Sequence, residues 1–442
     1  MRTLALTLVT MSLAACGDDS AGAGSGGASS GSGDGGSSSS KGNGPGSGNP
    51  TSGPGGGDGG GAGDGGGTTT DVGGGGDPSA GPTTTTTGSS GGGAPPCTAE
   101  TLAESVRIVT VADAAPSGSR AVTSQAGSGS VVAWVGADGV HITPLDAVDA
   151  RAGSDVVVEG TQVFGVAATE TDAAVLVARA PDYMTFIRVD RAGTVLARAD
   201  LVGGGDHAVE GVEWFGEFAQ TGRLVRQADG TYAAYHALHR HWPDGIGHQG
   251  DTLRLLDGSG VAVGSGWGWG CSHSMDQRLA YGPGGLIPIC ISDCYPGKGI
   301  YFNHQSSMIT DDPGANCAGG FATLLGGLVS TATGFALVYQ DDTALAHLGL
   351  FDVNGVNTSD RMLDVSGSSR LAAYEGGLLL GAQGASGASL TRLDAAGVAV
   401  GDAAEVPAGL PDQDFEGRAD GEVAWATASG GALSVARVRI CE

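Results

Sequence analysis

The chain has 442 residues, of which 84 are glycine and two are lysine, and its formal net charge at pH 7 is −26. This length is enough for one large domain or two ordinary ones. Nucleic-acid binding needs a basic surface to neutralise phosphates, so this composition argues against a nucleic-acid partner and against direct attraction to an anionic membrane.

The first residues carry an export pattern: one positive charge at Arg2, an apolar run from Leu4 to Leu13, and then small residues. The run is too short to span a bilayer as a mature helix. The sequence Leu13-Ala14-Ala15-Cys16 that follows resembles the lipobox of bacterial lipoproteins. The resemblance implies a signal peptide over residues 1–15 and a lipidated Cys16 as the new N-terminus. The alternative is an ordinary signal peptide with an incidental cysteine.

Lipidation would give the protein a membrane partner, because attached acyl chains hold a protein stably when there is more than one. Gly17 does not resemble the usual signal for retention in the inner membrane. We therefore expect the outer membrane, and the sequence leaves open which side of it the protein faces.

Residues 16–96 consist almost entirely of Gly, Ser, Thr, Pro and Asp. Such a segment cannot bury enough apolar surface to offset the entropy of ordering, so we expect a disordered, low-complexity tether. As a Gly-rich coil of about 80 residues it has a root-mean-square span of about 50 Å.

Residues 97–442 form the predicted folded domain, in which short apolar runs alternate with Gly, Asp and Ser. This texture indicates an all-β fold. The starts of seven such runs are separated by 42, 59, 54, 49, 43 and 45 residues, close to the period of a four-stranded propeller blade. The runs are Val131–Val135, Ala173–Ala178, Tyr232–Ala237, Leu286–Ile291, Phe335–Tyr339, Leu378–Leu380 and Val423–Ala426.

A turn pattern keeps the same register, with an aspartate followed three residues later by a glycine. It occurs at Asp190, Asp257, Asp352 and Asp394. An aspartate can bond its own backbone and a glycine can adopt positive φ, so each is a plausible hairpin between the two outer strands of a blade. The domain thus resembles a seven-bladed β-propeller of four-stranded antiparallel blades. A pair of β-sandwiches is the alternative.

The ends of the domain suggest ring closure. Ser105–Asp113 reads as a strand with no blade before it, whereas the last repeat has only three strands, so the first strand is expected to complete the last blade. A bridge between Cys97 and Cys441 would lock this junction in an oxidising compartment. In the loop-entropy model it contributes on the order of 5 kcal/mol.

The other four cysteines are expected on one face of the fourth blade and its junction with the fifth, in loops of the same side: Cys271, Cys290, Cys294 and Cys317. A hairpin turn at Gly282–Gly285 places Cys271 opposite Cys294, which leaves Cys290 for Cys317. Other connectivities remain open. A zinc site is the rival interpretation, disfavoured by export and by the lack of paired CxxC spacing.

Two long segments reach the same face, a connection over residues 203–218 and a loop over residues 236–251. Enlarged loops on a rigid scaffold usually carry function. The candidate ligand-binding residues are Trp214, Trp242, His248, Asp251, Trp267, Trp269, His273, Asp276 and Lys298. The tryptophans suit either stacking on a sugar ring or packing that holds the loops. Weak candidates for metal ligands are His239, His241 and His248. The alternative is that these are solvent-exposed or hydrogen-bonded loop histidines that bind no metal.

Catalysis has little support in the sequence. Ser272 and His273 are chain neighbours whose side chains usually diverge, and the folded part has no GxSxG elbow. We expect a binding protein for a glycan or protein ligand, using the loops of blades three to five, with no cofactor and no metal. The alternatives are a propeller hydrolase or lyase acting on an extracellular polysaccharide or peptide, and a structural envelope or adhesion component.

Overall fold

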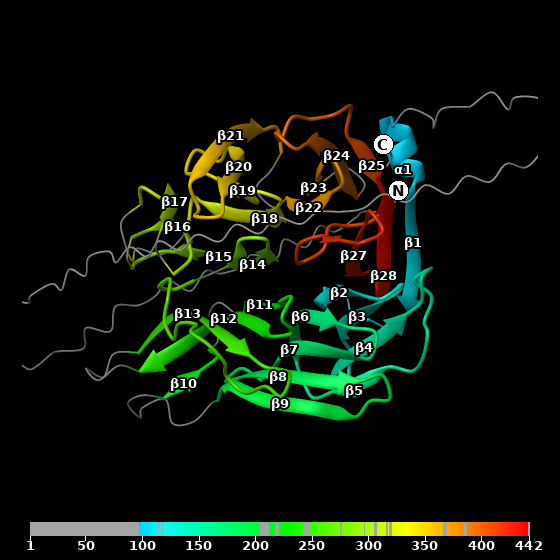
Figure 1. Cartoon of the computed structure of the whole chain (residues 1–442), viewed down its shortest axis with the longest axis vertical. Coiled ribbons are helices and arrows are strands. Elements are labelled where there is room, and N and C mark those ends of the chain that lie inside the picture. Colours follow the sequence, from blue (N-terminus) through cyan, green and yellow to red (C-terminus); the bar gives the residue numbers. More distant parts are fainter. Residues whose placement is uncertain are drawn as a thin grey trace, which may run out of the picture. The chain divides into compact units, whose positions relative to one another are not determined.

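The computed structural model describes residues 97–442 except 114, 117, 204–211, 217–220, 242–246, 275, 296, 305–306, 315–316, 318–320, 366–368, 384–386 and 441–442. Seven four-stranded antiparallel sheets follow one another in these residues, and Figure 1 shows them arranged around a common axis. The predicted seven-bladed β-propeller is therefore confirmed. No helix in the described part has the length and hydropathy needed to cross a membrane.

In five of the seven blades the four strands follow one another in sequence, ordered from the axis outward, and blades three and seven differ. Blades one and two contain β2 (Ala121–Ala126), β3 (Gly129–Val135), β4 (Val140–Leu145), β5 (Val156–Val158), β6 (Gln162–Ala168), β7 (Asp172–Ala180), β8 (Tyr183–Asp190) and β9 (Val195–Val202). Blades three and four contain β10 (Glu213–Trp214), β11 (Gly222–Arg226), β12 (Tyr232–His241), β13 (Gly247–Leu256), β14 (Gln277–Gly282), β15 (Gly285–Ser292), β16 (Gly299–Phe302) and β17 (Ser307–Asp311).

Blades five and six contain β18 (Leu324–Thr331), β19 (Gly334–Gln340), β20 (Ala346–Asp352), β21 (Asn357–Leu363), β22 (Arg370–Tyr374), β23 (Gly377–Gln383), β24 (Ala388–Asp394) and β25 (Ala404–Val406). Blade seven contains β26 (Glu416–Gly417), β27 (Glu422–Ser429), β28 (Ala432–Arg439) and, as its outer strand, β1 (Val106–Ala112), which follows helix α1 (Ala99–Glu104).

The ring closes through the first strand, as the sequence predicts. Strand β1 pairs antiparallel with β28, from Val106 opposite Val438 to Ala112 opposite Leu433. Blade seven thus combines the two ends of the domain, and its unfolding must break pairing between residues more than 300 positions apart. Cys97 is disulfide-bonded. Its predicted partner, Cys441, lies outside the described residues.

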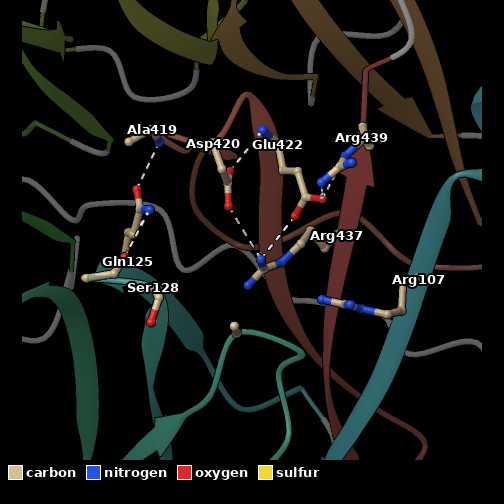
Figure 2. Close-up of a pocket in the computed structure, with 10 residues that line it drawn as sticks. Arg107, Gln125, Ser128, Ala419, Asp420, Glu422, Arg437 and Arg439 are labelled. Atoms are coloured by element: carbon tan, nitrogen blue, oxygen red, sulfur yellow. Dashed lines mark hydrogen bonds and ion pairs between the residues drawn. The ribbon is translucent and has the colours of Figure 1, made fainter. Parts of the chain in front are cut away.

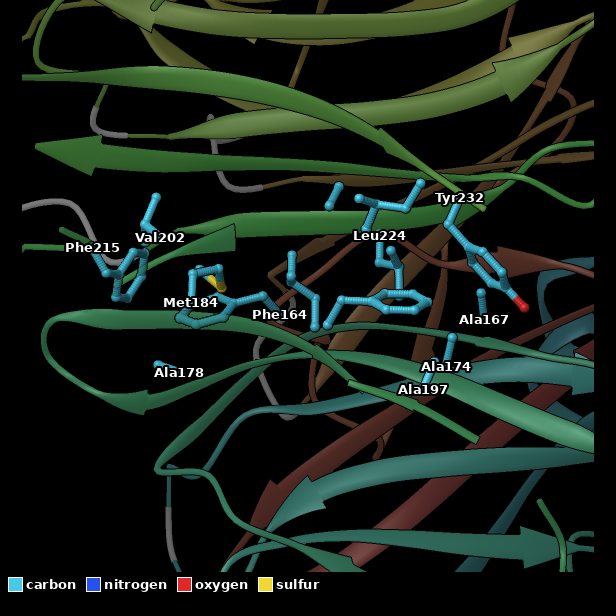
Figure 3. Packing of buried hydrophobic residues seen from close by; sticks show 14 of the residues in the cluster. Phe164, Ala167, Ala174, Ala178, Met184, Ala197, Val202, Phe215, Leu224 and Tyr232 are labelled. Carbon is cyan, nitrogen blue, oxygen red and sulfur yellow. The ribbon is translucent and has the colours of Figure 1, made fainter. Parts of the chain in front are cut away.

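The seven apolar runs are the second strands of the seven blades, β3, β7, β12, β15, β19, β23 and β27. These strands are apolar on both faces because each is covered by the neighbouring blade on either side. Figure 3 shows one such interface, in which Phe164 of β6, Met184 of β8 and Leu224 of β11 are buried with Phe215 and Tyr232. Burying a large side chain of this kind contributes about 1.5–3 kcal/mol.

The predicted Asp–Gly turns lie where expected, after the third strand of a blade. Oδ1 of Asp190 accepts hydrogen bonds from the backbone N–H groups of Ala192 and Thr194 at 2.9 and 2.8 Å. Gly193 has a φ of 89°, which is free of strain only for glycine. Asp257, Asp352 and Asp394 bond their turns in the same way.

Blade three departs from the regular pattern. Strand β12 runs past the end of β11, and β10 pairs with the projecting part, Trp214 lying opposite His239. The outer position is taken by an irregular segment that pairs with β13 through isolated bridges from Ala262 to Leu256 and from Trp267 to Leu253. The predicted loop over residues 236–251 is therefore mostly strand, because both of its ends continue the hairpin of β12 and β13.

Candidate functional site

Two disulfides fasten the connections around blade four. Cys271 bonds to Cys290 and Cys294 bonds to Cys317. The predicted gathering of these four cysteines is confirmed, but the predicted pairing is wrong. The ladder of β14 begins at Gln277, which lies opposite Cys290, so the residues before it do not continue the hairpin. They bond blade three instead, with the N–H of His273 donating to Gln249 O at 2.9 Å.

A buried carboxyl group organises the seam between blades three and four. Asp251 has no exposed surface. Its Oδ2 accepts a 2.8 Å hydrogen bond from the hydroxyl of Tyr235, and its Oδ1 accepts a 2.9 Å bond from Nε1 of Trp267. Burial raises the pKa of Asp251 to about 6, and the two side-chain hydrogen bonds oppose that rise. Asp251 and Trp267 were both predicted as candidate ligand-binding residues, and in the structure Asp251 fixes the position of Trp267.

Trp267 and Trp269 stand at the outer edge of this seam, where both are partly exposed. The ring of His304, an exposed residue, lies 5.1 Å from the ring of Trp267, and its Nε2 is 2.8 Å from the carbonyl oxygen of Trp269. The ring of Trp269 covers Gly250, where an added Cβ would come within 2.7 Å of the indole. We call Trp267, Trp269 and His304 the blade 3–4 rim. His304 was not among the predicted residues, because 31 positions separate it from His273 in sequence.

His248 and His273 meet next to the rim, with ring centroids 5.7 Å apart. Nδ1 of His273 is 2.8 Å from Oδ1 of Asp293, a side chain largely buried in the connection after β15. His273 has a φ of 45°, a left-handed conformation that is uncommon outside glycine. The structure therefore brings together two predicted histidines from blades three and four.

The three histidines named as weak metal candidates do not converge. His239 and His241 lie on one face of β12 beside Trp214, at ring distances of 4.8 and 5.2 Å. His248 lies opposite Arg240 in the ladder and therefore on the other face. Among the described residues, only Asp251, Cys271 and Cys290 place three donor atoms within 4.8 Å of one another. Those two sulfurs form the disulfide, so this set does not hold a metal while it is oxidised.

Lys298 is buried, and its Nζ lies 3.3 Å from Oδ1 of Asp312. Asp312 also accepts backbone hydrogen bonds from Ala322 and Thr323 at 2.8 and 3.1 Å. Burial pushes its pKa upward, but these bonds outweigh that effect and lower it. Lys298 thus holds the connection into blade five. Trp242 lies outside the described residues.

Whereas His273 pairs with Asp293, Asp276 pairs with two arginines. Its Oδ1 accepts a 2.5 Å hydrogen bond from Nη1 of Arg278 and lies 3.9 Å from Nη2 of Arg223. Burial pushes the pKa of Asp276 upward, but Arg278 and Arg223 outweigh it and lower the pKa. These arginines open the innermost strands, near the propeller axis.

Sequence reasoning missed this arginine set, although a signal was present. An arginine followed by leucine opens the inner strand of blades three, four and six, at Arg223, Arg278 and Arg370. Arg120 immediately precedes the inner strand of blade one. We call these four residues the axial arginine cluster.

A surface cavity of about 500 Å³ lies between blades one and seven, at the opposite end of the inner strands. Figure 2 shows Arg437 and Arg439 beside Glu422, with Arg107 on the neighbouring strand. Arg437 lies 3.0 Å from Glu422 and 2.6 Å from the fully buried Asp149, which also bonds Arg107 at 2.7 Å. The charges lining this cavity are paired across the closure of the ring, which indicates a structural role.

No family model and no curated protein matches this chain. Among solved structures, the Dos1 propeller is 12% identical, with a TM-score of 0.42, over 71% of this chain and 78% of that chain. The SapL1 lectin in complex with alpha methyl fucoside is 13% identical, with a TM-score of 0.38, over 66% and 98%. The gluconolactonase XC5397 from Xanthomonas campestris is 12% identical, with a TM-score of 0.37, over 75% and 90%. At these values the similarity concerns the fold alone.

Proposed function

We propose that this chain is a lipid-anchored envelope protein that binds a glycan through the loops of blades three to five, with the blade 3–4 rim at the centre of the site. The proposal rests chiefly on the position of Trp267. Its ring is partly exposed, while its Nε1 is fixed by Asp251 and its backbone pairs with Leu253. A preorganised aromatic ring offers a large apolar face to a sugar with little loss of conformational entropy.

Anchoring at the membrane rests on the Leu13–Cys16 sequence and the tether that follows it. Acyl chains on Cys16 would attach the protein to the outer membrane, and residues 17–96 would let the propeller reach ligands about 50 Å away. The two disulfides of blade four support an oxidising compartment, since such bonds are rare in the cytosol.

The test is a glycan screen on the full-length chain, repeated with Trp267→Ala and His304→Ala. Tyr281→Ala is the matched control, because Tyr281 is an exposed aromatic residue on β14 outside the rim. We expect saturable binding of at least one glycan, weakened roughly tenfold by either rim variant and unchanged by the control. Glycan binding that survives both rim variants contradicts the proposal. Capture of an envelope protein in place of a glycan would favour a protein ligand.

Hydrolysis or lyase chemistry is the second candidate function, and the contact between His273 and Asp293 favours it. A carboxylate that bonds one imidazole nitrogen fixes the tautomer and orients the ring, which leaves the other nitrogen to act as a base. The check is product release from extracellular polysaccharides and peptides by the wild-type chain and by His273→Ala. Equal release by both chains, or no release by either, excludes His273 as a base.

A further inference from the structure

The axial arginines of three blades share one side-chain hydrogen bond. Nη1 of Arg223, Arg278 and Arg370 donates to the carbonyl oxygen of the preceding residue, at 2.8, 2.9 and 3.1 Å. Each arginine also lies opposite the residue three positions after the start of its blade's apolar run, namely Tyr235, Ile289 and Gly381. The blade repeat therefore directs several guanidinium groups to the same end of the axis, in a chain with a net charge of −26.

Two of the four arginines hold a segment that crosses the axis, residues 411–414, which leads into blade seven. Nε of Arg370 donates to the carbonyl oxygen of Pro411 at 2.9 Å, and Nε of Arg278 lies 3.8 Å from Asp414. Gln413 of the same segment donates to the carbonyl oxygen of Phe164 in blade two. Arg278 and Arg370 thus have a structural role.

The other two, Arg120 and Arg223, lack comparable partners. Nε of Arg223 and Nη1 of Arg120 are buried and have no hydrogen-bond partner among the described residues. Arg223 is 7% exposed, and its nearest carboxylate in the described chain is that of Asp276, at 3.9 Å. The guanidinium of Arg120 lies 4.7 Å from the centre of the Phe164 ring. A buried donor left unpaired costs about 1–3 kcal/mol, and more when it is charged.

We propose that Arg120 and Arg223, at the end of the axis where the inner strands begin, bind the oxyanion of a small ligand, a carboxylate or phosphate group. Guanidinium groups present several N–H donors in a planar fork that matches both kinds of oxyanion. Arg278 and Arg370 contribute positive charge and fix the 411–414 segment beside the site. The site is separate from the blade 3–4 rim and does not depend on the glycan proposal.

The electrostatics of the cluster agree with an anion as the missing partner. Burial, with a smaller contribution from Arg278, lowers the pKa of Arg223 to about 9 against the opposing effect of Asp276. Burial likewise lowers the pKa of Arg120. Four arginines here face three carboxylates, those of Asp276, Asp412 and Asp414, which act on their pKa values. A bound oxyanion would satisfy the free donors and stabilise the charged form of Arg223.

Isothermal titration of the full-length chain in detergent tests the proposal, with glucuronate, inorganic phosphate and neutral glucose as the probes. The variants are Arg120→Gln and Arg223→Gln, with Arg223→Lys to keep the charge while removing Nε. Arg198→Gln is the matched control, since Arg198 is an exposed arginine paired with Glu159 at 2.8 Å on blade two. Circular dichroism shows whether each variant is folded. If Arg223→Gln does not fold, Arg120→Gln tests the proposal in its place, because Arg120 is partly exposed.

We expect saturable binding of glucuronate or phosphate, no binding of glucose, and a loss of roughly tenfold or more in affinity for each axial glutamine variant. Binding should weaken with rising salt, and Arg198→Gln should leave it unchanged. Saturable binding of glucuronate would indicate a carboxylate ligand, and saturable binding of inorganic phosphate would indicate a phosphate ligand. Failure of both anions to bind the wild-type chain, or binding that both axial variants retain, overturns the proposal. Variants of the blade 3–4 rim leave this binding unchanged, so the two proposals fail independently.

Discussion

Nε1 of Trp267 donates a 2.9 Å hydrogen bond to Oδ1 of Asp251, a carboxyl group with no exposed surface. The bond joins the outer edge of blade three to its third strand and sets the orientation of the ring at the blade 3–4 rim. The exposed rim therefore depends on a buried group that is able to titrate.

Asp251 should make stability depend on pH. Its pKa in the folded protein, about 6, lies above the ordinary value of 3.8. Its contribution is therefore fully present below about pH 4 and is lost as the pH rises through 6, by about 3 kcal/mol in total. Urea denaturation from pH 4 to pH 7 should show the wild-type chain losing this much stability relative to Asp251→Asn, because the other titrating groups, His236 among them, are common to both chains. Parallel pH profiles for the two chains would show that Asp251 is not the group responsible.

His236 should act in the opposite direction. It is fully buried, and burial lowers its pKa from 6.5 to about 4. Its neutral form therefore supports the fold above about pH 6.5, and this contribution is lost as the pH falls toward 4, by about 3 kcal/mol. Between pH 7 and pH 4 the wild-type chain should lose this much stability relative to His236→Asn, as measured by denaturant midpoints at pH 7, 5.5 and 4, because the opposite effect of Asp251 is common to both chains. An unchanged difference between pH 7 and pH 4 would contradict the assignment.

The disulfide of Cys271 and Cys290 should stabilise the seam of blades three and four. Its sequence separation is 19 residues, for which the loop-entropy model gives about 3 kcal/mol. Thermal unfolding of the Cys271→Ala/Cys290→Ala variant should show this loss. Peptide mapping without reductant checks the connectivity, and a fragment that links Cys271 to Cys294 would refute it.

Closure of the ring should depend on Arg437 more than on its neighbour Arg439. Both pair with Glu422, but Arg437 is buried and also neutralises the buried Asp149, whereas Arg439 is exposed. Arg437→Gln should lower the free energy of unfolding by about 3 kcal/mol, because it leaves Asp149 with Arg107 alone. Arg439→Gln should cost less than about 1 kcal/mol. Equal effects of the two substitutions would contradict this account.

Membrane attachment should depend on Cys16. Replacing it by serine removes the acylation site, so the chain should move from the membrane fraction to the soluble fraction on ultracentrifugation. Replacing Ser20, which lies outside the lipobox, is the control. Retention of the Cys16→Ser chain in membranes would show that another feature anchors the protein.

The sequence by itself determined the seven blades. The second strand of each blade is covered on both sides and must be apolar, so the apolar runs recur in the sequence at the spacing of the blades. It also determined the closure by β1 and the turns at Asp190 and its equivalents, since those turns need one acceptor and one glycine. Only the tertiary structure decided the cysteine pairing, because the chain before Gln277 leaves the ladder and bonds blade three. The same holds for the axial arginines and for the contact between Trp267 and Asp251, where residues distant in sequence meet at the axis or between blades. Such contacts follow from how the blades pack against one another, which strand periodicity does not encode.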